Sequence, residues 1–543
     1  YPEKRLTPFT RLHVKGGIYM PIILANNLSF QLDTGEWLFK DITFNLSTRL
    51  TGLVGRNGAG KSLLLSLLLG QIQPTSGNVS RQGSIGFYSQ LPSALLDTNI
   101  TIADFLGITK KLGALHAIEQ GSCEIQHFNI IGDDWDLVAR TKQLLATLKI
   151  ISDLNTLCCS LSGGQLALLQ LHQLFTSNHE ILILDEPSNH LDSDGRNWVL
   201  EQCQLFAGKV LIVSHDRSLL KHMEGIYHLS SLGLRFYKGN YDDYYKQISS
   251  QSEALDKQIA HHQSEKKRLE RQAQTNKEKA QQRESQGNRL RKSGSQSKIL
   301  LDAMKDKAGQ SQAALATNQR NLIDQNQHKL QSLKGQKERL KPQTLYLQQS
   351  NISKKSSLLT VENCRLVYGS GAPISFSLSQ GERSSLTGAN GCGKSTLLKA
   401  IHGQHSNYTG YIKRLGTTVY LDQHFGLLDT NDTMFDCLVT HSCGMTESDA
   451  RTLLAGIGFR RDSVYRKVAH LSGGEKMKLA MLIVSHKQDS PLLLLDEPDN
   501  HLDIDSKQIL ASALREYQGA FILVSHDSDF VEEVGVSQNH IRL

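Results

Sequence analysis

The 543-residue sequence contains no run of eighteen or more apolar residues, so it predicts no helix that spans a membrane. Its densest apolar stretch, Leu63–Leu69, is too short for that role and predicts a buried helix. The eight cysteines form no CxxC pair and no zinc-ligand spacing with histidine. Scattered thiols in a long chain are typical of a reducing, cytoplasmic setting.

The first nineteen residues lack the apolar core that a signal peptide needs. They carry four basic side chains, and the first methionine follows at Met20. A strand-like apolar run, Pro21–Phe30, begins directly after it. We therefore expect residues 1–19 to be a disordered extension.

The net charge of +7 is unevenly distributed along the chain. Residues 251–341 contain 20 Lys and Arg against 10 Asp and Glu, whereas the rest of the chain contains 40 and 43. The whole positive excess therefore lies in one segment. Such a local excess favours a polyanionic partner for that segment rather than for the entire surface.

Five short strings recur in the same order in the two halves of the chain. The first half contains GRNGAGKS (55–62), GFYSQ (86–90), LSGGQ (161–165), ILILDEPSNHLD (181–192) and LIVSHD (211–216). The second half contains GANGCGKST (388–396), VYLDQ (419–423), LSGGE (471–475), LLLLDEPDNHLD (492–503) and ILVSHD (522–527). The two lysines of the first string are 333 residues apart, so the repeating unit is a whole domain. The interval from the second to the third string is longer in the first copy, which predicts a small inserted subdomain there.

The first string of each copy has the GxxxxGK[ST] pattern of a phosphate-binding loop. Its glycines let backbone N–H groups close around a phosphate, its lysine reaches the β- and γ-phosphates, and its serine offers a hydroxyl to Mg²⁺. The helix that follows points its positive end at the same charge. The candidate ATP-binding residues are Gly55, Asn57, Gly58, Gly60, Lys61, Ser62, Gly388, Asn390, Gly391, Gly393, Lys394, Ser395 and Thr396.

The fourth string predicts a buried parallel strand that ends on a carboxylate pair. We expect Asp185 and Asp496 to hold the Mg²⁺ shell, and Glu186 and Glu497 to polarise the attacking water. Phosphoryl transfer depends on such positioning and charge neutralisation more than on covalent chemistry.

The second and fifth strings supply the remaining candidate catalytic residues. His215 and His526 each follow a further apolar strand, where a histidine can sense the γ-phosphate. Gln90 and Gln423 are expected to contact Mg²⁺ and the water, which makes Ser62, Gln90, Ser395 and Gln423 the candidate metal ligands.

Both copies resemble ATP-binding cassette (ABC) ATPase domains, because the LSGG string separates that family from other phosphate-loop ATPases. The resemblance covers roughly residues 21–245 and 357–543. It implies an ATP hydrolase whose two sites are shared: Ser472, Gly473 and Gly474 complete the first site, and Ser162, Gly163 and Gly164 complete the second. It also implies an aromatic residue that stacks on adenine. Tyr368 fits this role in the second copy, whereas the first copy offers Leu32 or Phe30.

The segment between the copies contains no proline from about Tyr244 to Lys341. Its apolar residues at heptad-like spacing predict two long antiparallel helices with a break near Ser293–Ser295. These residues are Ile248, Leu255, Ile259, Leu269, Leu315, Leu322, Leu333 and Leu340, and the basic tip contains Arg283, Arg289, Arg291, Lys292 and Lys298. The hairpin either spaces the domains or contacts nucleic-acid phosphates.

The predicted fold is therefore α/β, with two phosphate-loop ABC-type domains joined by a long antiparallel helical hairpin. The expected boundaries are 20–245 for the first domain, 246–342 for the basic linker and 343–543 for the second domain. We call the two domains the first and second cassette.

This arrangement resembles the ABC-F proteins, with DEPxNHLD in both cassettes and a Gly239–Tyr241 string after the first. The resemblance implies a cytoplasmic translation factor or antibiotic-resistance protein that binds ribosomal RNA, and tRNA, near the tRNA exit site. Leu63 and Asp499 replace a usual threonine, and Glu475 replaces a glutamine, which predicts altered rates rather than loss of function. A DNA-associated ABC ATPase and a transporter cassette that acts with separate membrane proteins remain the alternatives.

Overall fold

The computed structural model describes most of the chain. The described residues are 22–89, 99–150, 153–189, 191–292, 298–336, 357–367, 371–422, 425–442, 445–459, 461–486, 491–500, 502–536 and 539–543. Residues 1–19 and the candidate residues Gln90, Tyr368 and Gln423 lie outside these ranges.

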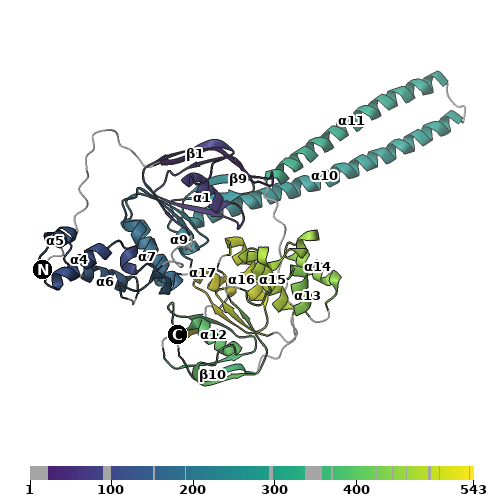
Figure 1. Cartoon of the computed structure of the whole chain (residues 1–543). Helices are drawn as coiled ribbons and strands as arrows, with labels where there is room; N and C mark the ends of the chain where they lie inside the picture. The colour runs from purple at the N-terminus through teal and green to yellow at the C-terminus, as the bar shows by residue number, and fades with distance from the viewer. Residues whose placement is uncertain are drawn as a thin grey trace, which may run out of the picture.

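The first cassette combines a six-stranded sheet, a three-stranded sheet and two groups of helices (Figure 1). Its strands are β1 (Ile22–Gln31), β2 (Trp37–Asn45), β3 (Leu50–Gly55), β4 (Ser76–Gln82), β5 (Ile85–Tyr88), β6 (Ile181–Asp185), β7 (Lys209–Val213), β8 (Gly225–Ser230) and β9 (Gly233–Lys238). Its helices are α1 (Lys61–Leu69), α3 (Ile102–Phe105), α4 (Thr109–Glu119), α5 (Ile125–Ile131), α6 (Leu137–Thr147), α7 (Gly163–Thr176), α8 (Ser193–Leu205) and α9 (Arg217–Leu220).

The larger sheet has the order β5-β6-β7-β3-β8-β9 and is parallel except for its last pair. The smaller antiparallel sheet has the order β2-β1-β4, and helix α1 packs into the core next to both. Four leucines of α1 are buried there, as the apolar run at 63–69 predicts. Strand β6 is apolar at successive positions because helices cover both faces of a parallel sheet.

The second cassette repeats this plan. Its strands are β10 (Ser357–Leu366), β11 (Ile374–Ser379), β12 (Arg383–Thr387), β13 (Tyr408–Arg414), β14 (Thr418–Leu421), β15 (Leu492–Asp496), β16 (Phe521–Val524) and β17 (His540–Arg542). Its α-helices are α12 (Lys394–His402), α13 (Met434–His441), α14 (Glu447–Gly456), α15 (Gly473–Ser485), α16 (Ile504–Glu516) and α17 (Ser528–Val534). A parallel sheet of order β14-β15-β16-β12-β17 lies beside an antiparallel sheet of order β11-β10-β13.

The two cassettes differ between their second and third strings. The first has α3 to α6 in this region, where the described residues of the second have α13 and α14. The extra helices account for the longer interval in the first copy. None of the helices in the described ranges combines the length and the apolar character that crossing a membrane requires.

A helical hairpin projects from the first cassette (Figure 1). It consists of α10 (Tyr241–Lys292) and α11 (Lys298–Gln336), so the helices end and begin on either side of the predicted break. Helix α10 starts inside the first cassette, where Tyr241 and Tyr244 are buried in the core. The predicted fold class, two cassettes joined by a long antiparallel hairpin, is thereby confirmed.

The predicted contacts along the hairpin are partly wrong. Leu269 and Leu333 are buried between the helices, but Leu315 and Leu322 are 65% and 53% exposed. The positions of α11 that face α10 are Gln319, Ile323, Asn326, Leu330 and Leu333, which keep a spacing of three and four residues. Two of these positions are polar, so the leucines at 315 and 322 do not mark the face of α11 that packs against α10.

The polar contacts of this seam explain how it tolerates amides. Asn326 is buried, its side-chain oxygen lies 2.7 Å from Nδ1 of His262, and its amide donates to the His262 backbone oxygen at 3.1 Å. A buried polar side chain costs little stability when such bonds are made.

Candidate active site

The first phosphate loop joins β3 to α1. Gly58 and Gly60 have φ angles of 80° and 92°, a conformation that residues with a Cβ rarely adopt. A Cβ on Gly60 would also lie 2.7 Å from the ring of Phe39. The loop therefore requires glycine at this position for both reasons, in agreement with the GxxxxGK pattern.

The lysine of each loop bonds to the loop itself. Lys61 donates from Nζ to the backbone oxygens of Gly55 at 2.7 Å and Arg56 at 3.2 Å. Lys394 makes the same two bonds in its own loop, at 2.7 and 3.1 Å. Lys61 Nζ also lies 2.8 Å from Nε2 of His215, and burial lowers the pKa of Lys61. The structure thus gathers the phosphate-loop lysine and the fifth-string histidine at one point.

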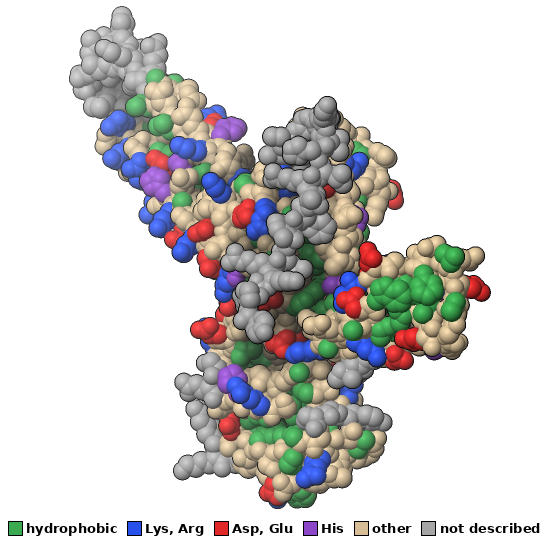
Figure 2. Space-filling model, turned by 90° about the vertical axis from the view of Figure 1, so that its left-hand side faces the viewer, with side chains coloured by type: hydrophobic (Ala, Val, Ile, Leu, Met, Phe, Trp, Pro, Cys, Tyr) green, Lys and Arg blue, Asp and Glu red, His purple; other side chains and the backbone are tan. Residues whose placement is uncertain are grey.

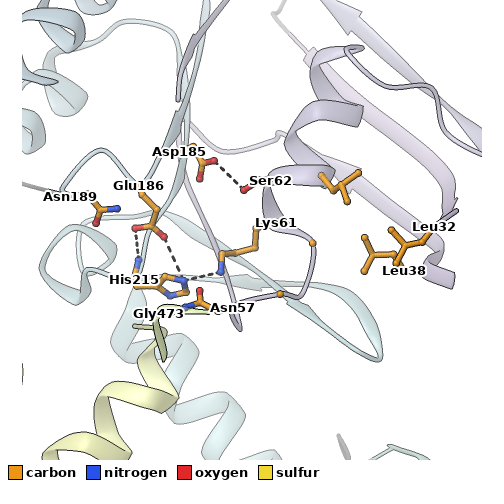
Figure 3. A pocket seen from close by; sticks show the side chains of 13 residues that line it. Leu32, Leu38, Asn57, Lys61, Ser62, Asp185, Glu186, Asn189, His215 and Gly473 are labelled. Atoms are coloured by element: carbon orange, nitrogen blue, oxygen red, sulfur yellow. Dashed lines mark hydrogen bonds and ion pairs between the residues drawn. The ribbon is translucent and has the colours of Figure 1, made fainter. Parts of the chain in front are cut away.

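The carboxylates of the first site lie at the end of β6, beside this lysine (Figure 3). Ser62 donates to Oδ2 of Asp185 at 3.3 Å, and burial raises the pKa of Asp185. The backbone N–H of His215 donates to Oε2 of Glu186 at 3.4 Å, and the His215 ring lies 3.6 Å from the other oxygen. Burial raises the pKa of Glu186 to about 7 and lowers the pKa of His215 well below its usual value.

The second site also has a serine, an aspartate, a glutamate and a histidine, and in addition a tyrosine that contacts the aspartate. Asp496 ends β15 and is buried, and burial raises its pKa although Ser395 and Tyr420 donate hydrogen bonds to it. The Tyr420 hydroxyl is 2.8 Å from Oδ2 of Asp496. His526 lies 3.5 Å from a carboxylate oxygen of Glu497, whose φ of 50° matches the 49° of its counterpart in the first site.

The first site opens into a cavity that both cassettes line. The cavity has a volume of about 640 Å³, and its walls include Lys61 from the first cassette and Gly473 from the second. The backbone N–H of Asn57 donates to Oδ2 of Asp503 at 2.9 Å across the interface. The neighbouring Arg56 forms an ion pair with Asp505 at 2.7 Å. The structure thus brings the second signature string to the first phosphate loop.

The second site is bounded by a different part of the opposite cassette. Its cavity of about 610 Å³ is lined by Lys394 together with Asp192, Ser193 and Asp194. The backbone N–H of Asn390 donates to Oδ2 of Asp192 at 3.4 Å. The predicted partners Ser162, Gly163 and Gly164 are absent from this wall as far as the described residues define it. The opposite cassette thus contributes to the wall of each cavity, through Gly473 in the first and Asp192 in the second.

Each signature string begins a helix through a capping box. The Ser162 hydroxyl accepts from the backbone N–H of Gln165 at 3.3 Å, and the backbone N–H of Ser162 donates to Oε1 of Gln165 at 3.1 Å. Ser472 and Glu475 do the same at the start of α15. Glutamine and glutamate serve equally in this arrangement, so Glu475 keeps the local structure of the string.

Five charged residues meet between the two sites, and we call them the interface ion cluster. Arg196 of the first cassette donates to the His526 backbone oxygen at 3.1 Å and pairs with Asp216 at 3.2 Å. Lys507 of the second cassette pairs with Asp527 at 2.7 Å. The fifth member is Asp499, which is 2% exposed and whose pKa is raised by burial, although Lys507 opposes the shift.

The five strings alone did not predict this cluster. Arg196 and Lys507 occupy equivalent positions in α8 and α16, so the basic residue is shared by both copies. Asp499 replaces the serine found at the same place in the first cassette, Ser188. The repeat therefore contained the signal, four residues after each NHLD string.

The far end of the first cavity is apolar. Leu32 and Leu38 line it, whereas Phe30 packs against the core of the cassette. Of the two adenine-contacting candidates in the first copy, the structure places Leu32 at the cavity.

The donor sets fit magnesium. Ser62 with Asp185, and Ser395 with Asp496, each pair a hydroxyl with a carboxylate. Mg²⁺ prefers such oxygen ligands and commonly completes its shell with substrate phosphates and water. Among the described residues, no group of three or more His, Cys, Asp or Glu forms a separate metal cage.

Comparison with known proteins places these features in a family. The ABC transporter family profile matches residues 39–189 and 372–500. The ATP-binding protein YdiF of Bacillus subtilis is 32% identical over 96% of this chain and 81% of its own length. ABC transporter F family member 2 of Arabidopsis thaliana is 30% identical over 92% and 74%.

The chain belongs to the ABC-F family. As an ABC-F protein it is an ATP hydrolase whose two cassettes bind ATP. Solved structures agree in fold: an archaeal ribosome recycling factor, aABCE1, superposes with a TM-score of 0.55, covering 94% of this chain and 86% of its own. An RNase-L inhibitor gives 0.52 and covers 89% and 81%. Both are 17% identical, so the similarity concerns the twin-cassette fold alone.

Proposed function

We propose that this ABC-F ATPase binds the ribosome near the tRNA exit site while both cassettes hold ATP, and leaves it after hydrolysis. The observation that carries the proposal is the position of the positive charge. The excess of 20 basic over 10 acidic residues in 251–341 falls on the segment that forms the projecting hairpin. Figure 2 shows Lys and Arg side chains along its visible face.

The exposed charges of the hairpin suit a phosphate backbone. Lys277, Lys279, Arg283 and Arg289 are exposed on α10. RNA binding of this kind releases counterions, so its affinity falls steeply with salt. Two structural neighbours support the choice of the ribosome: one is described as a ribosome recycling factor, and another, with a TM-score of 0.50, as ribosome-bound.

Each ATP site would work through its own side chains. Lys61 and Lys394 would leave their loop carbonyls to bind the β- and γ-phosphates, and Glu186 and Glu497 would polarise the water. Bound Mg²⁺ would supply charge neutralisation, held by Ser62 and Asp185 in the first site, by Ser395 and Asp496 in the second, and by Gln90 and Gln423.

The histidines would fix the glutamates and the γ-phosphate in one geometry. His215 bonds to Glu186 through its backbone N–H and lies beside Lys61, and His526 lies beside Glu497. The signature string of the opposite cassette would close on the phosphates of each site. These residues would be Ser472, Gly473 and Gly474 at the first site and Ser162, Gly163 and Gly164 at the second. Tyr368 would stack on adenine in the second site.

The test uses a variant that binds ATP without hydrolysing it. Glu186→Gln combined with Glu497→Gln is expected to co-sediment with 70S ribosomes in ATP, whereas the wild type dissociates. The proposal fails if this variant stays in the supernatant at low salt.

A matched pair of charge variants tests the hairpin within that background. Replacing the exposed Lys277 and Arg283 of α10 by Gln should reduce binding and flatten its salt dependence, by roughly 0.7–0.9 in log–log slope per lost phosphate contact. Replacing the exposed Arg235 and Lys238 of β9 by Gln should leave binding unchanged. Equal losses in the two variants would refute a specific role for the hairpin.

The second candidate function is a DNA-associated ABC ATPase that uses the same basic hairpin. Competition separates the two: duplex or branched DNA should fail to displace ribosomes at equal phosphate concentration if the leading proposal is right. Within that proposal, addition of the wild-type protein and ATP to drug-inhibited translation distinguishes a translation factor from antibiotic resistance by ribosome protection, with the trapped variant, which cannot leave the ribosome, as the negative control.

A further inference from the structure

The two cassettes hold the aspartate at the end of the fourth string differently. In the second cassette, β14 runs parallel to β15, and Tyr420 pairs with Leu494, two residues before Asp496. Side chains two residues apart on a strand share a face. The Tyr420 phenol therefore lies on the face of Asp496 and donates to its Oδ2 at 2.8 Å.

The first cassette has phenylalanine at this place. Phe87 of β5 pairs with Ile183, again two residues before the aspartate, Asp185. Its ring packs against the apolar core of the cassette. The geometry of the two strands is thus the same, and a single hydroxyl distinguishes them.

The phenol of Tyr420 is itself held in place. Its ring lies 6.0 Å from that of His402, the last residue of α12, and Nδ1 of His402 is 2.9 Å from the Thr418 hydroxyl. Helix α12 begins with Lys394 and Ser395 of the phosphate loop. The tyrosine therefore connects the aspartate to the phosphate-loop helix.

We propose that Tyr420 is a positioning residue for the second ATP site. Its hydroxyl fixes the carboxylate of Asp496 before nucleotide arrives, so that the aspartate and Ser395 present their oxygens together to the magnesium of Mg-ATP. The first site lacks this donor, because phenylalanine carries no hydroxyl. The second site consequently reaches half-saturation with Mg-nucleotide at a lower Mg²⁺ concentration than the first. The inference rests on the proposed use of Mg-ATP at both sites.

The experiment reads each site separately by nucleotide binding. Lys61→Ala leaves the second site intact, and Lys394→Ala leaves the first. In these backgrounds the binding of a fluorescent ATP analogue is titrated with Mg²⁺, and metal-free binding in EDTA is recorded as the reference.

In the Lys61→Ala background, Tyr420→Phe is expected to raise the Mg²⁺ concentration for half-maximal binding by about tenfold, the usual effect of losing a residue that orients a metal ligand. Binding in EDTA should not change. In the Lys394→Ala background, Phe87→Tyr should shift the Mg²⁺ requirement downward. An unchanged or lowered requirement in Tyr420→Phe overturns the proposal, and a lowered one would mean that the hydroxyl competes with the metal.

Asp496→Asn in the Lys61→Ala background separates this inference from the proposed function. If it leaves the Mg²⁺ dependence intact, the assignment of Asp496 to magnesium fails. If it abolishes that dependence while Tyr420→Phe has no effect, only the role of Tyr420 fails. Should Tyr420→Phe not fold, as judged by circular dichroism, Phe87→Tyr decides the question alone: an unshifted Mg²⁺ requirement overturns the proposal.

Discussion

Lys507 offers a sharp test of the charge balance inside the interface ion cluster. Its ammonium lies 2.7 Å from Asp527 inside the interface ion cluster, and only 7% of the residue is exposed. Burial by itself lowers the pKa of Lys507, but Asp527 and Asp499 outweigh this effect and raise it. Lys507 is therefore charged, and its positive charge compensates the negative charges of the buried aspartates.

The size of the effect follows from the geometry. At 2.7 Å and an effective dielectric constant of about 20, the pair attraction is about 6 kcal/mol, and much of it offsets the removal of both charges from water. Deleting only the lysine leaves the acids buried, which costs about 3–5 kcal/mol of unfolding free energy. Lys507→Met is the variant of choice because it keeps the length of the side chain.

Asp499 provides the control. The first cassette carries Ser188 at the equivalent place, so Asp499→Ser fits the local structure. Lys507→Met should cost about 2 kcal/mol less in the Asp499→Ser background, since one fewer buried acid remains unpaired.

The pH dependence has a definite sign. Burial raises the pKa of Asp499 above its unfolded value, so the folded chain binds the proton more tightly than the unfolded chain. Its contribution to stability is present below the ordinary Asp range, near pH 4, and is lost as pH rises through the raised value. The cost of Lys507→Met should therefore be smaller at acidic pH than at pH 8, and Asp499→Ser should reduce this difference.

Urea unfolding with two signals makes the measurement. All three tryptophans, Trp37, Trp135 and Trp198, belong to the first cassette, so their fluorescence reports that cassette, whereas circular dichroism reports both. Lys507→Met should make the second cassette unfold at a lower urea concentration than the first. This earlier transition should appear mainly in circular dichroism. Unfolding curves that superimpose on those of the wild type would refute the reasoning, as would an equal cost with and without Asp499.

Three further predictions follow from single contacts. Alkylation of the half-buried Cys392 in the second phosphate loop should block binding of an ATP analogue at that site; Cys392→Ala should be resistant, and equal inhibition of both would place the reactive thiol elsewhere. Arg217 of α9 pairs with Glu533 of α17 at 2.5 Å and so joins the first cassette to the second. Arg217→Glu should therefore slow ATP hydrolysis, and adding Glu533→Arg should restore it. Absence of rescue in the double variant would contradict a specific pair. In the hairpin, Leu330→Ala should cost about 2 kcal/mol and Leu322→Ala less than about 0.5 kcal/mol by thermal unfolding, and similar costs would contradict the seam described above.

The sequence predicts those features that its repeat makes visible. Two occurrences of the same five strings gave the twin-cassette fold, the buried strands before Asp185 and Asp496, and the proximity of Lys61 to His215. Each of these depends on short-range geometry, in which a strand end or a tight loop fixes the side chain.

Features that depend on packing between distant segments were harder to predict. Leu322 faces solvent because Asn326 and Gln319 occupy the seam of the hairpin, and hydrophobicity alone does not reveal such a choice. The contacts of Arg196 with the second cassette and of Tyr420 with Asp496 depend on how two strands or two domains meet. The repeat marks Arg196 and Lys507 as equivalent positions, but it does not show which residues of the other cassette they contact.

The continuity of α10 has a mechanical consequence. The helix runs unbroken for 52 residues from the buried Tyr241, a length of about 78 Å at about 1.5 Å per residue. A rotation of the first cassette by about 5° would displace its far end by about 7 Å, or roughly two base steps of about 3.4 Å. An angular change of this size is small at the phosphate loop but is amplified along the hairpin, so the RNA contact proposed above would move from one nucleotide to another.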